Sequence, residues 1–308
     1  MKILVVGCGY IGWPLAVNLA RAGHEVHGMR RSFPPAIEAD PPGLVRLQAD
    51  ITRPATLERL PAGYDWVVLC AASGGGGAEA YRSLYVDGTR NVMEWLAAVP
   101  PRKLVYTSST SVYGQDDGSV VDEASPTQPP TETGQLLVQA ERQLLAAARA
   151  SEVPAVVLRL AGIYGPGRGY WLRRFLTGEA FVEGRGQRFL NMIHRDDVIG
   201  AVTAALEGAG AGEIFNVVDN EPVSQVELFK WLARRLDRPM PPSVEEDAAL
   251  VRKRGSSNKR VSNRKLATQL GYQLKYPSFR EGYEAKITTE FMDFTDNTEG
   301  KKRHPRNL

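Results

Sequence analysis

Six residues near the N-terminus have the types and spacing of a phosphate-binding loop. They read Gly7-Cys8-Gly9-Tyr10-Ile11-Gly12, the pattern G-x-G-x-x-G. They follow an apolar run at 3–6 and open a helix-like segment at 11–22, which is the context that a dinucleotide site requires. The first glycine permits a tight turn, the second lets the backbone approach a diphosphate, and the third lets helix and strand pack closely. The amides that open the helix would then face the phosphates. The pattern predicts dinucleotide binding by Gly7, Gly9, Tyr10, Ile11 and Gly12.

Residue types near the end of the second expected strand address which dinucleotide binds. An NAD site usually has an acid about 20 residues beyond the fingerprint, where it accepts from the ribose 2′-OH. Here Arg30 and Arg31 stand in that region, and guanidinium groups suit a 2′-phosphate better. We therefore predict NADP as the preferred cofactor over NAD, unless the two arginines are solvated loop charges. Further cofactor contacts are predicted at Asp50, Ile51, Ala71 and Ala72, where Asp50 either contacts the adenine or caps residues 54–60.

These residues need a scaffold, and strand-like segments alternate with helix-like ones along the chain. Such repeated units predict an α/β fold, a doubly wound parallel sheet of the Rossmann type with a smaller C-terminal substrate-binding part. We expect residues 1–165 to form the dinucleotide-binding domain, 166–284 the smaller part and 285–308 a basic tail. The expected strands are 3–6, 25–29, 44–47, 66–70, 103–106, 155–160 and 213–219, the last returning to the first domain, and the expected helices include 11–22, 79–98 and 135–150.

Composition limits the class of protein. The 308 residues are 43% hydrophobic and 24% charged, close to globular averages, which argues against a disordered or fibrous chain. No run of about 18 apolar residues would span a membrane, and the N-terminus lacks a signal-peptide pattern, so we expect a cytoplasmic protein. The net charge of +3 depends on four cations in residues 301–308, which leaves no case for a nucleic-acid partner. Two cysteines in apolar surroundings predict neither a disulfide framework nor a zinc site.

Seven segments, in this order, carry a family resemblance: VVGCGYIG, DWVVLCAA, VDGTRNV, TSSTSVYG, LRLAGIYGPG, NMIHRDDV and EIFNVVDNEPVS. The chain resembles extended short-chain dehydrogenases/reductases of the NAD-dependent epimerase/dehydratase group, in particular an atypical subgroup of nucleoside-diphosphate-sugar epimerase-like proteins. The resemblance covers most of residues 1–284. It implies an NAD(P)-binding oxidoreductase that acts on a nucleotide sugar or a similar polar hydroxyl compound. It also implies a homodimer formed by 79–98 and 135–150, whose leucines 136, 137, 144 and 145 could equally serve the core.

The catalytic pattern of that family is broken in this chain. The family usually carries Tyr-x-x-x-Lys on the helix after the fifth strand, where the lysine lowers the tyrosine pKa and the tyrosine exchanges a proton with the substrate. A match to Glu141 places Thr133 at the tyrosine position and Leu137 at the lysine position. No lysine occurs between Lys103 and Lys230, so a small shift of the match cannot restore the pair.

Of two other catalytic positions of the family, one matches the family pattern in this chain and one departs from it. Ser109 matches the family hydroxyl that bonds the reacting oxygen, although a strand-end hydroxyl also satisfies backbone. Tyr85 replaces the family's helix asparagine. Among Tyr85, Tyr113, Tyr164 and His194 we name Tyr85 as a substitute proton donor, although a phenol without a neighbouring cation is a poor acid.

The substrate side is predicted to be cationic. The candidates are Arg168, Arg188, His194 and Arg260, and residues 251–265 carry seven cations and no acid. This stretch is either an anion trap or a solvated basic loop. Asp196 is expected to cap the helix that starts near Asp197, and His194 has no partner at metal-ligand spacing, so no metal is predicted.

Two functions remain open on these residues. The first is an NAD(P)-dependent oxidoreductase or epimerase-like enzyme with a small-molecule, anionic substrate. The second is a non-catalytic NAD(P)-binding sensor or regulator, favoured by Thr133 and Leu137. A fold by itself does not decide between them.

Overall fold

A computed structural model describes residues 1–34, 39–150, 153–245, 257–285 and 287. Its centre is a seven-stranded sheet in the order β12-β7-β5-β4-β1-β2-β3, in which every neighbouring pair is parallel. The strand order reverses between β1 and β4, the place where doubly wound sheets bind ligands. The expected fold class is therefore confirmed. The strands are β1 (Lys2–Val6), β2 (Glu25–Arg30), β3 (Leu44–Gln48), β4 (Trp66–Leu69), β5 (Lys103–Ser109), β7 (Ala155–Leu160) and β12 (Ile214–Val217).

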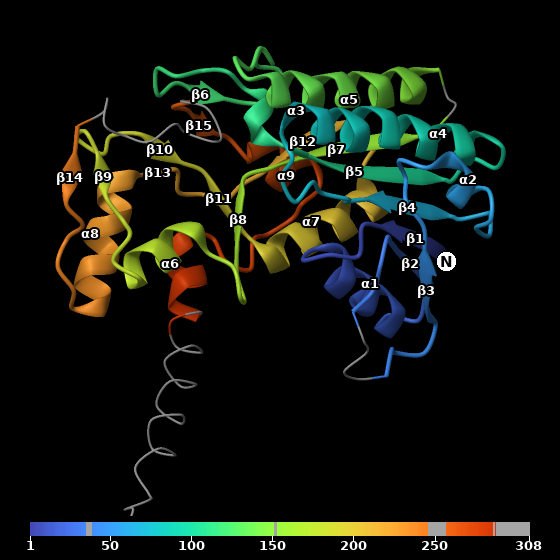
Figure 1. Cartoon of the computed structure of the whole chain (residues 1–308), viewed down its shortest axis with the longest axis horizontal. Helices are drawn as coiled ribbons and strands as arrows, with labels where there is room; N and C mark the ends of the chain where they lie inside the picture. The colour runs from blue at the N-terminus through green and yellow to red at the C-terminus, as the bar shows by residue number, and fades with distance from the viewer. Residues whose placement is uncertain (35–38, 151–152, 246–256, 286, 288–308) are drawn as a thin grey trace, which may run out of the picture.

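Helices cover both faces of this sheet (Figure 1). One apolar layer joins the sheet to α4 (Thr89–Ala97) and α5 (Glu132–Arg149), and the opposite layer joins it to α1 (Gly12–Arg21) and α7 (Arg195–Gly208). The central strands have buried side chains on both faces, which explains why they are apolar almost throughout, with Arg159 of β7 as an exception. Short helices α2 (Pro54–Leu57) and α9 (Arg264–Gln269) lie at the edges of the sheet.

The expected helix at 79–98 is interrupted in the structure. It consists of α3 (Gly77–Tyr81), a π-helical segment (Arg82–Gly88) and α4. At the end of the π-helical segment, a Cβ on Gly88 would lie 2.8 Å from the Ile51 side chain. The helix passes very close to the loop after β3 at this point. Tyr85 lies inside the π-helical segment, a kind of distortion that often accompanies functional sites.

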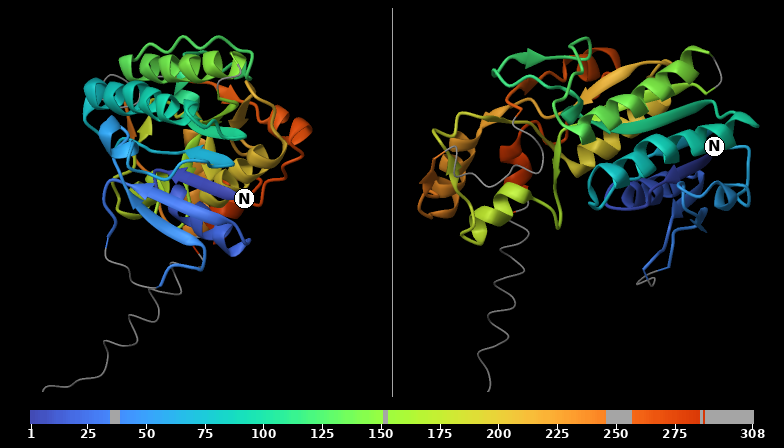
Figure 2. Two further views of the ribbon diagram at one scale, coloured as in Figure 1. Left: turned by 90° about the vertical axis from the view of Figure 1, so that its right-hand side faces the viewer. Right: turned by 45° about the horizontal axis from the view of Figure 1, so that its top comes forward.

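A smaller part packs beyond the carboxyl ends of the sheet strands (Figures 1 and 2). Its apolar cluster draws on α6 (Tyr170–Leu176), α8 (Gln225–Leu236) and the helical residues 279–285. Two-stranded pairs connect it: β8 (Gly162–Tyr164) with β11 (Met192–His194), β9 (Val182–Glu183) with β14 (Ser243–Val244), β10 (Phe189–Leu190) with β13 (Val223–Ser224), and β6 (Val120–Val121) with β15 (Arg260–Val261).

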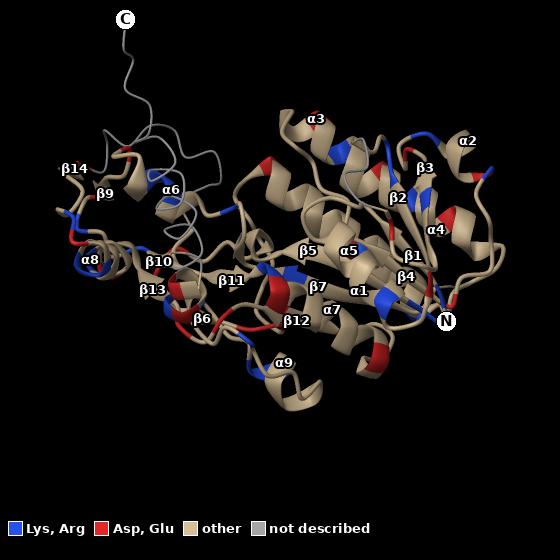
Figure 3. Cartoon of the chain, turned by 90° about the horizontal axis from the view of Figure 1, so that it is seen from below, with Lys and Arg blue, Asp and Glu red and all other residues tan. Residues whose placement is uncertain are grey.

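Acidic and basic residues are interspersed along the described ribbon, without a continuous basic face in the view of Figure 3. No helix in the described residues is long and apolar enough to cross a membrane. Leu136, Leu137 and Leu144 of α5 are buried in the protein's own core. They are therefore not available for a helix-pairing dimer contact, and the tail at 288–308 lies outside the described residues.

Candidate cofactor and substrate site

The three fingerprint glycines have different structural roles. Gly7 has a φ of +98°, and a Cβ there would collide with the backbone of Ala71. A Cβ on Gly12 would collide with the Gly7 carbonyl and lie 2.8 Å from the Cys70 sulfur. Gly9 is exposed, and its Cβ would meet nothing closer than the Gly7 carbonyl at 4.0 Å. The fold therefore needs Gly7 and Gly12, whereas Gly9 leaves an open approach to the backbone.

The start of α1 has the electrostatics of an anion site. Ile11 is its N-cap residue and makes no side-chain cap, and the first turn carries no acid. The positive end of the helix dipole and its amides therefore face the open side of the loop without a protein carboxylate. Together with the open approach at Gly9, this arrangement fits the diphosphate of a dinucleotide.

At the expected adenine end, Arg30 and Arg31 are both exposed. Arg30 is close enough to Cys8 for its charge to oppose the effect of burial, which raises the pKa of that thiol to about 12. Both arginine side chains are therefore accessible to a 2′-phosphate. The preference of the protein for NADP over NAD stays a prediction.

Asp50 does not cap residues 54–60. Its Oδ1 accepts hydrogen bonds from the amide and hydroxyl of Thr52, at 3.0 and 2.8 Å, and α2 starts after Arg53 without a side-chain cap. Asp50 stabilises its own turn because an aspartate readily bonds the backbone two residues on. Of the other predicted contacts, Ile51 is buried, Ala71 lies beside Gly7, and Ala72 is exposed.

Ser109 ends β5 and is held by Ser111, a residue that the sequence did not single out. The Ser109 hydroxyl oxygen accepts from the Ser111 amide at 3.2 Å and from the Ser111 hydroxyl at 3.0 Å. Ser109 thereby caps the short 3₁₀ turn Thr110–Val112. A hydroxyl has two acceptor lone pairs and one proton, so this geometry leaves the Ser109 proton to donate. Ser109 can therefore have both predicted roles at once. Its oxygen supports the backbone at Ser111, and its proton can be donated to a substrate oxygen.

The usual dyad positions hold no acid–base pair. Thr133 is half-buried in the first turn of α5, behind the N-cap Thr131, and Leu137 is 5% exposed and packed in the core. A leucine there can neither hold a ribose nor perturb a phenol. The assignment of Thr133 and Leu137 to the dyad positions stays a prediction from the sequence match.

A buried polar network lies directly behind Ser109. Ser108 donates to Glu141 at 2.5 Å, and Arg159 pairs with Glu141 at 2.8 Å. Arg159 also donates to the Tyr113 hydroxyl at 2.8 Å, which donates to Asn216 at 2.8 Å. The network joins β5, α5, β7 and β12, and it employs Tyr113 as a hydrogen-bonding residue. Because its charges are paired and buried, we infer that it fixes the end of β5 in position.

Tyr85 supports the glycine-rich loop after β4. Its hydroxyl oxygen accepts from the Ser73 amide at 3.2 Å, and its ring lies against Tyr81. Burial raises the pKa of Tyr85, which makes the phenol a weaker acid at neutral pH. No cation that would oppose this shift is among its causes. The geometry therefore favours a structural role for Tyr85 over the predicted proton transfer.

Arg168, Arg188 and Arg260 have different partners, whereas His194 lies beside the turn that carries Arg168, with its Nε2 3.2 Å from where a Cβ on Gly165 would be. The Arg168 guanidinium lies 5.2 Å from the Tyr10 ring centroid, and Arg188 is 3.6 Å from Glu183. Arg260 donates to the Gly118 carbonyl at 2.9 Å. His194 is 3% exposed and is the N-cap of α7.

The prediction that Asp196 caps α7 is wrong. The His194 ring nitrogen Nδ1 accepts from the Asp196 amide at 3.2 Å, and the helix starts one residue later, at Arg195. The Asp196 carboxylate instead faces Arg195 at 3.0 Å and Lys275 at 3.7 Å. A histidine is an uncommon cap, which is why the aspartate was the natural expectation.

The basic stretch does not form the expected anion trap in its described part. Lys265 faces Glu213 at 3.8 Å, Arg264 is exposed, and Lys259 is 4% exposed. Residues Arg252, Lys253 and Arg254 lie outside the described residues.

Lys259 fits neither alternative predicted for residues 251–265, an anion trap or a solvated basic loop, because its side chain is buried. Its ammonium donates to the Tyr113 carbonyl at 3.0 Å and to the Ser257 hydroxyl at 2.8 Å. Burial, and next to it the Arg188 charge, lowers the pKa of Lys259 to about 8. The fold thus places a buried lysine against the Tyr113 carbonyl. Tyr113 stands two residues after Ser111, in the segment that follows β5.

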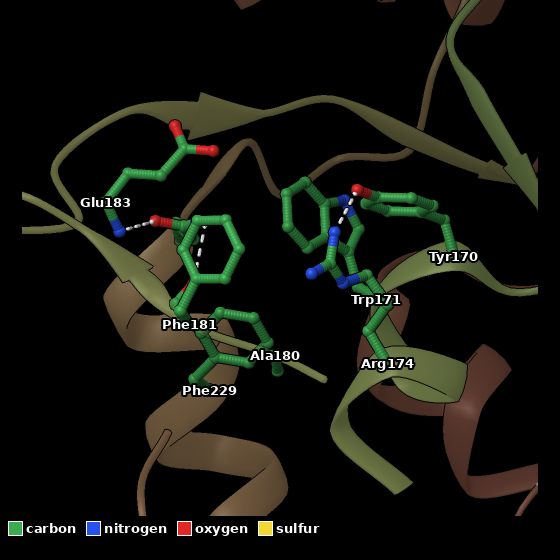
Figure 4. A pocket seen from close by; sticks show the side chains of 8 residues that line it. Tyr170, Trp171, Arg174, Ala180, Phe181, Glu183 and Phe229 are labelled. Carbon is green, nitrogen blue, oxygen red and sulfur yellow. Dashed lines mark hydrogen bonds between the residues drawn. The ribbon is translucent and has the colours of Figure 1, made fainter. Parts of the chain in front are cut away.

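A small cavity lies within the C-terminal part (Figure 4). It measures about 10 Å³, room for roughly one water molecule. Gln225 closes it by accepting from the Glu183 amide at 2.9 Å, so it offers no space for a base or sugar. Its lining includes Tyr170, Trp171, Arg174, Phe181 and Phe229. Within the described residues, no three His, Cys, Asp or Glu side chains are grouped to hold a metal.

Comparison with known proteins decides the family. The model of the NAD-dependent epimerase/dehydratase family matches residues 3–217, which includes the glycine loop, Ser109 and all seven sheet strands. The chain belongs to this family.

Members and relatives of the family resemble the chain over nearly its whole length. Protein YeeZ of Escherichia coli is 27% identical, covering 90% of this chain and 96% of YeeZ. The 3-diazoavenalumate denitrifying reductase of a Streptomyces species is 29% identical, covering 92% and 99%. The solved structure of a conserved protein of unknown function from Silicibacter pomeroyi is 31% identical with a TM-score of 0.73, covering 92% and 97%. As the family description and the glycine loop agree, the chain is an SDR-type, NAD(P)-binding protein of the epimerase/dehydratase family.

Proposed function

We propose that this protein is an NAD(P)-dependent oxidoreductase that acts on a small polar carbonyl or hydroxyl compound, with NADP as the preferred cofactor. The observation that carries the proposal is the Ser109–Ser111 hydroxyl pair at the end of β5. It lies at the same edge of the sheet as the glycine loop after β1. Parallel strands bring their carboxyl ends to one edge, so a compound bound there meets both.

Each side of the site has a definable task. The glycine loop and the start of α1 would hold the diphosphate, and Arg30 and Arg31 would meet a 2′-phosphate. The bound dinucleotide would supply or accept a hydride. Ser109, with both lone pairs engaged by Ser111, would donate its proton in a hydrogen bond to the substrate oxygen.

The absence of the Tyr–Lys pair narrows the range of reactions and substrates that fit this site. Neither Thr133 nor Leu137 provides the acid–base partner that epimerisation of a sugar hydroxyl needs. The separate environments of Arg168, Arg188 and Arg260 also weaken the expectation of a nucleotide sugar. Reduction of a carbonyl compound needs a hydride, which the reduced cofactor would supply, and one proton at the carbonyl oxygen. Without the dyad, Ser109 would donate a hydrogen bond to that oxygen and solvent water would supply the proton. The name of the 29% identical denitrifying reductase supports a reductase.

The test starts with calorimetric titration of NADP and NAD, followed by oxidation of the reduced cofactor with a panel of small carbonyl compounds. Ser109→Ala should lower kcat/KM about 10- to 100-fold, as loss of one oriented donor does, and leave the nucleotide dissociation constant unchanged. Ser119→Ala, at a surface turn, is the matched control. Equal activity of the Ser109→Ala and Ser119→Ala proteins would reject the role of the hydroxyl pair. Tighter binding of NAD than NADP would reject the cofactor preference.

A second function, an NAD(P)-binding sensor, is supported by the buried Leu137 in place of the family lysine. A sensor must bind the oxidised and reduced cofactors with different affinity, since only a difference can shift its state. No turnover across the panel, together with at least tenfold discrimination between NADP and NADPH, would favour it.

A further inference from the structure

Tyr10, the one aromatic side chain of the glycine loop, lies between two guanidinium groups. The Arg168 guanidinium is 5.2 Å from its ring centroid, and that of Arg195 is 5.5 Å away. Both distances are those of cation–π contacts. The two arginines belong to segments more than 150 residues away along the chain, so tertiary structure alone brings them to the fingerprint.

The turn that carries Arg168 is locked onto Tyr10. The Tyr10 hydroxyl donates to the Pro166 carbonyl at 3.0 Å. Gly165 and Arg168 exchange two backbone hydrogen bonds, at 2.8 and 2.9 Å. A Cβ on Gly165 would lie 3.0 Å from the Tyr10 hydroxyl oxygen, so the turn needs glycine to approach this closely. The backbone of the turn that carries Arg168 is therefore held against the glycine loop by these contacts.

Positive charge exceeds negative charge around Tyr10. Arg168 is exposed, and in the part of the chain that the structure describes it makes no ion pair within 4 Å. Arg195 pairs with Asp196 at 3.0 Å, but that carboxylate also faces Lys275 at 3.7 Å. The charges that act on Tyr10 are therefore two guanidinium groups and one carboxylate, beside a loop whose amides already favour an anion. An oriented guanidinium on an aromatic face, with its donors unused, is suited to bidentate contact with phosphate oxygens.

We propose that Arg168 and Arg195 close over the diphosphate of the dinucleotide held by the glycine loop, with Tyr10 as the platform that orients them. The inference rests on the proposed function only in requiring that a pyridine dinucleotide binds. It moves Arg168 from the substrate to the cofactor, and it makes the C-terminal part a direct contributor to cofactor affinity. The diphosphate is then bound from two sides, by backbone amides of the glycine loop and by guanidinium groups from the turn before α6 and from the start of α7.

The experiment compares ligands that differ in the diphosphate. ADP-ribose carries it and adenosine does not, and neither can react, so binding is measured without turnover. ADP-ribose and NADP are titrated by calorimetry, and adenosine is followed by ligand-observed NMR. The variants are Arg168→Met and Arg195→Met, and the matched control is Arg173→Met, which removes an exposed arginine of α6. Thermal unfolding of each variant establishes that it is folded.

We expect Arg168→Met and Arg195→Met each to weaken ADP-ribose and NADP about tenfold, as loss of a charge-assisted contact does. Adenosine binding should change less than about twofold, and the salt dependence of ADP-ribose binding should become shallower. Arg168→Lys should recover only part of the affinity, since an ammonium cannot stack or bind bidentately.

Two results overturn the inference while leaving the proposed function intact. One is ADP-ribose binding by both variants within twofold of Arg173→Met. The other is an equal loss for adenosine, which would mean that the arginines support the loop rather than the phosphates. A wild-type protein that binds neither ADP-ribose nor NADP would overturn the proposed function as well.

Discussion

A methyl group placed on Gly9 separates folding from cofactor binding. The Gly9 backbone does not adopt a positive φ, and an added Cβ would have only the Gly7 carbonyl near it, at 4.0 Å. Gly9→Ala should therefore leave the free energy of unfolding within about 0.5 kcal/mol of wild type, or raise it slightly through loss of unfolded-state freedom. The same methyl group would occupy the open approach over which a diphosphate reaches the loop.

The expected loss of affinity follows from the bonds displaced. Lifting a diphosphate off the loop removes one or two amide–phosphate hydrogen bonds, each worth about 1.5–3 kcal/mol when charge-assisted. A loss of about 2–4 kcal/mol corresponds to roughly 30- to 1000-fold in the dissociation constant. Gly12→Ala is the contrasting variant. Its Cβ would collide with the Gly7 carbonyl and lie 2.8 Å from the Cys70 sulfur, so it should destabilise the fold by about 1–3 kcal/mol.

Urea unfolding and calorimetry with NADP and NAD measure the two effects separately. The reasoning predicts a folded Gly9→Ala protein that binds weakly and a Gly12→Ala protein with a lower unfolding midpoint. Undiminished binding by Gly9→Ala would refute it, because the ligand would then not approach over that residue. Marked unfolding of Gly9→Ala would equally refute the open space assigned to its Cβ.

Three further outcomes test the surroundings of the site. Glu141→Gln should lower the free energy of unfolding by about 3–5 kcal/mol, since it leaves the buried Arg159 charge unpaired, and chemical denaturation that finds less than 1 kcal/mol would contradict the network's role. Lys259 has a depressed pKa of about 8 against an ordinary 10.5, so the unfolded chain binds more protons between these values. The stability of wild type relative to Lys259→Met should therefore rise from pH 8 to 10.5, by up to about 3 kcal/mol, and a flat difference in pH-dependent urea melts would reject the depressed pKa. Tyr85→Phe should speed hydrogen exchange at the Ser73 amide, which loses its acceptor, while any turnover persists; abolished turnover in a folded protein would restore Tyr85 as a proton donor.

Predictions from the sequence were correct for elements whose structure depends on residues close together in the chain. Apolar runs on both faces predicted the central strands, and the glycine pattern predicted the turn and helix that follow β1. The π-helical segment at Tyr85 was not predicted, because the residue pattern at 79–98 is that of a regular helix and the packing of Gly88 against Ile51, more than 30 residues earlier, is set only in the fold. The sequence also favoured Asp196 over His194 as a cap, since cap preferences describe residue types and not the approach of the preceding strand.

The sequence by itself determined the sheet, the glycine loop and the absence of the tyrosine–lysine pair, because each depends on residues close together in the chain. Only the tertiary structure decided what the charged residues do. It buried Lys259 at the exit of β5, dispersed the predicted anion site, and brought Arg168 and Arg195 to Tyr10. The physical reason is that a charge acts through its neighbours in space and through its exposure to water, and the chain fixes both only when it folds.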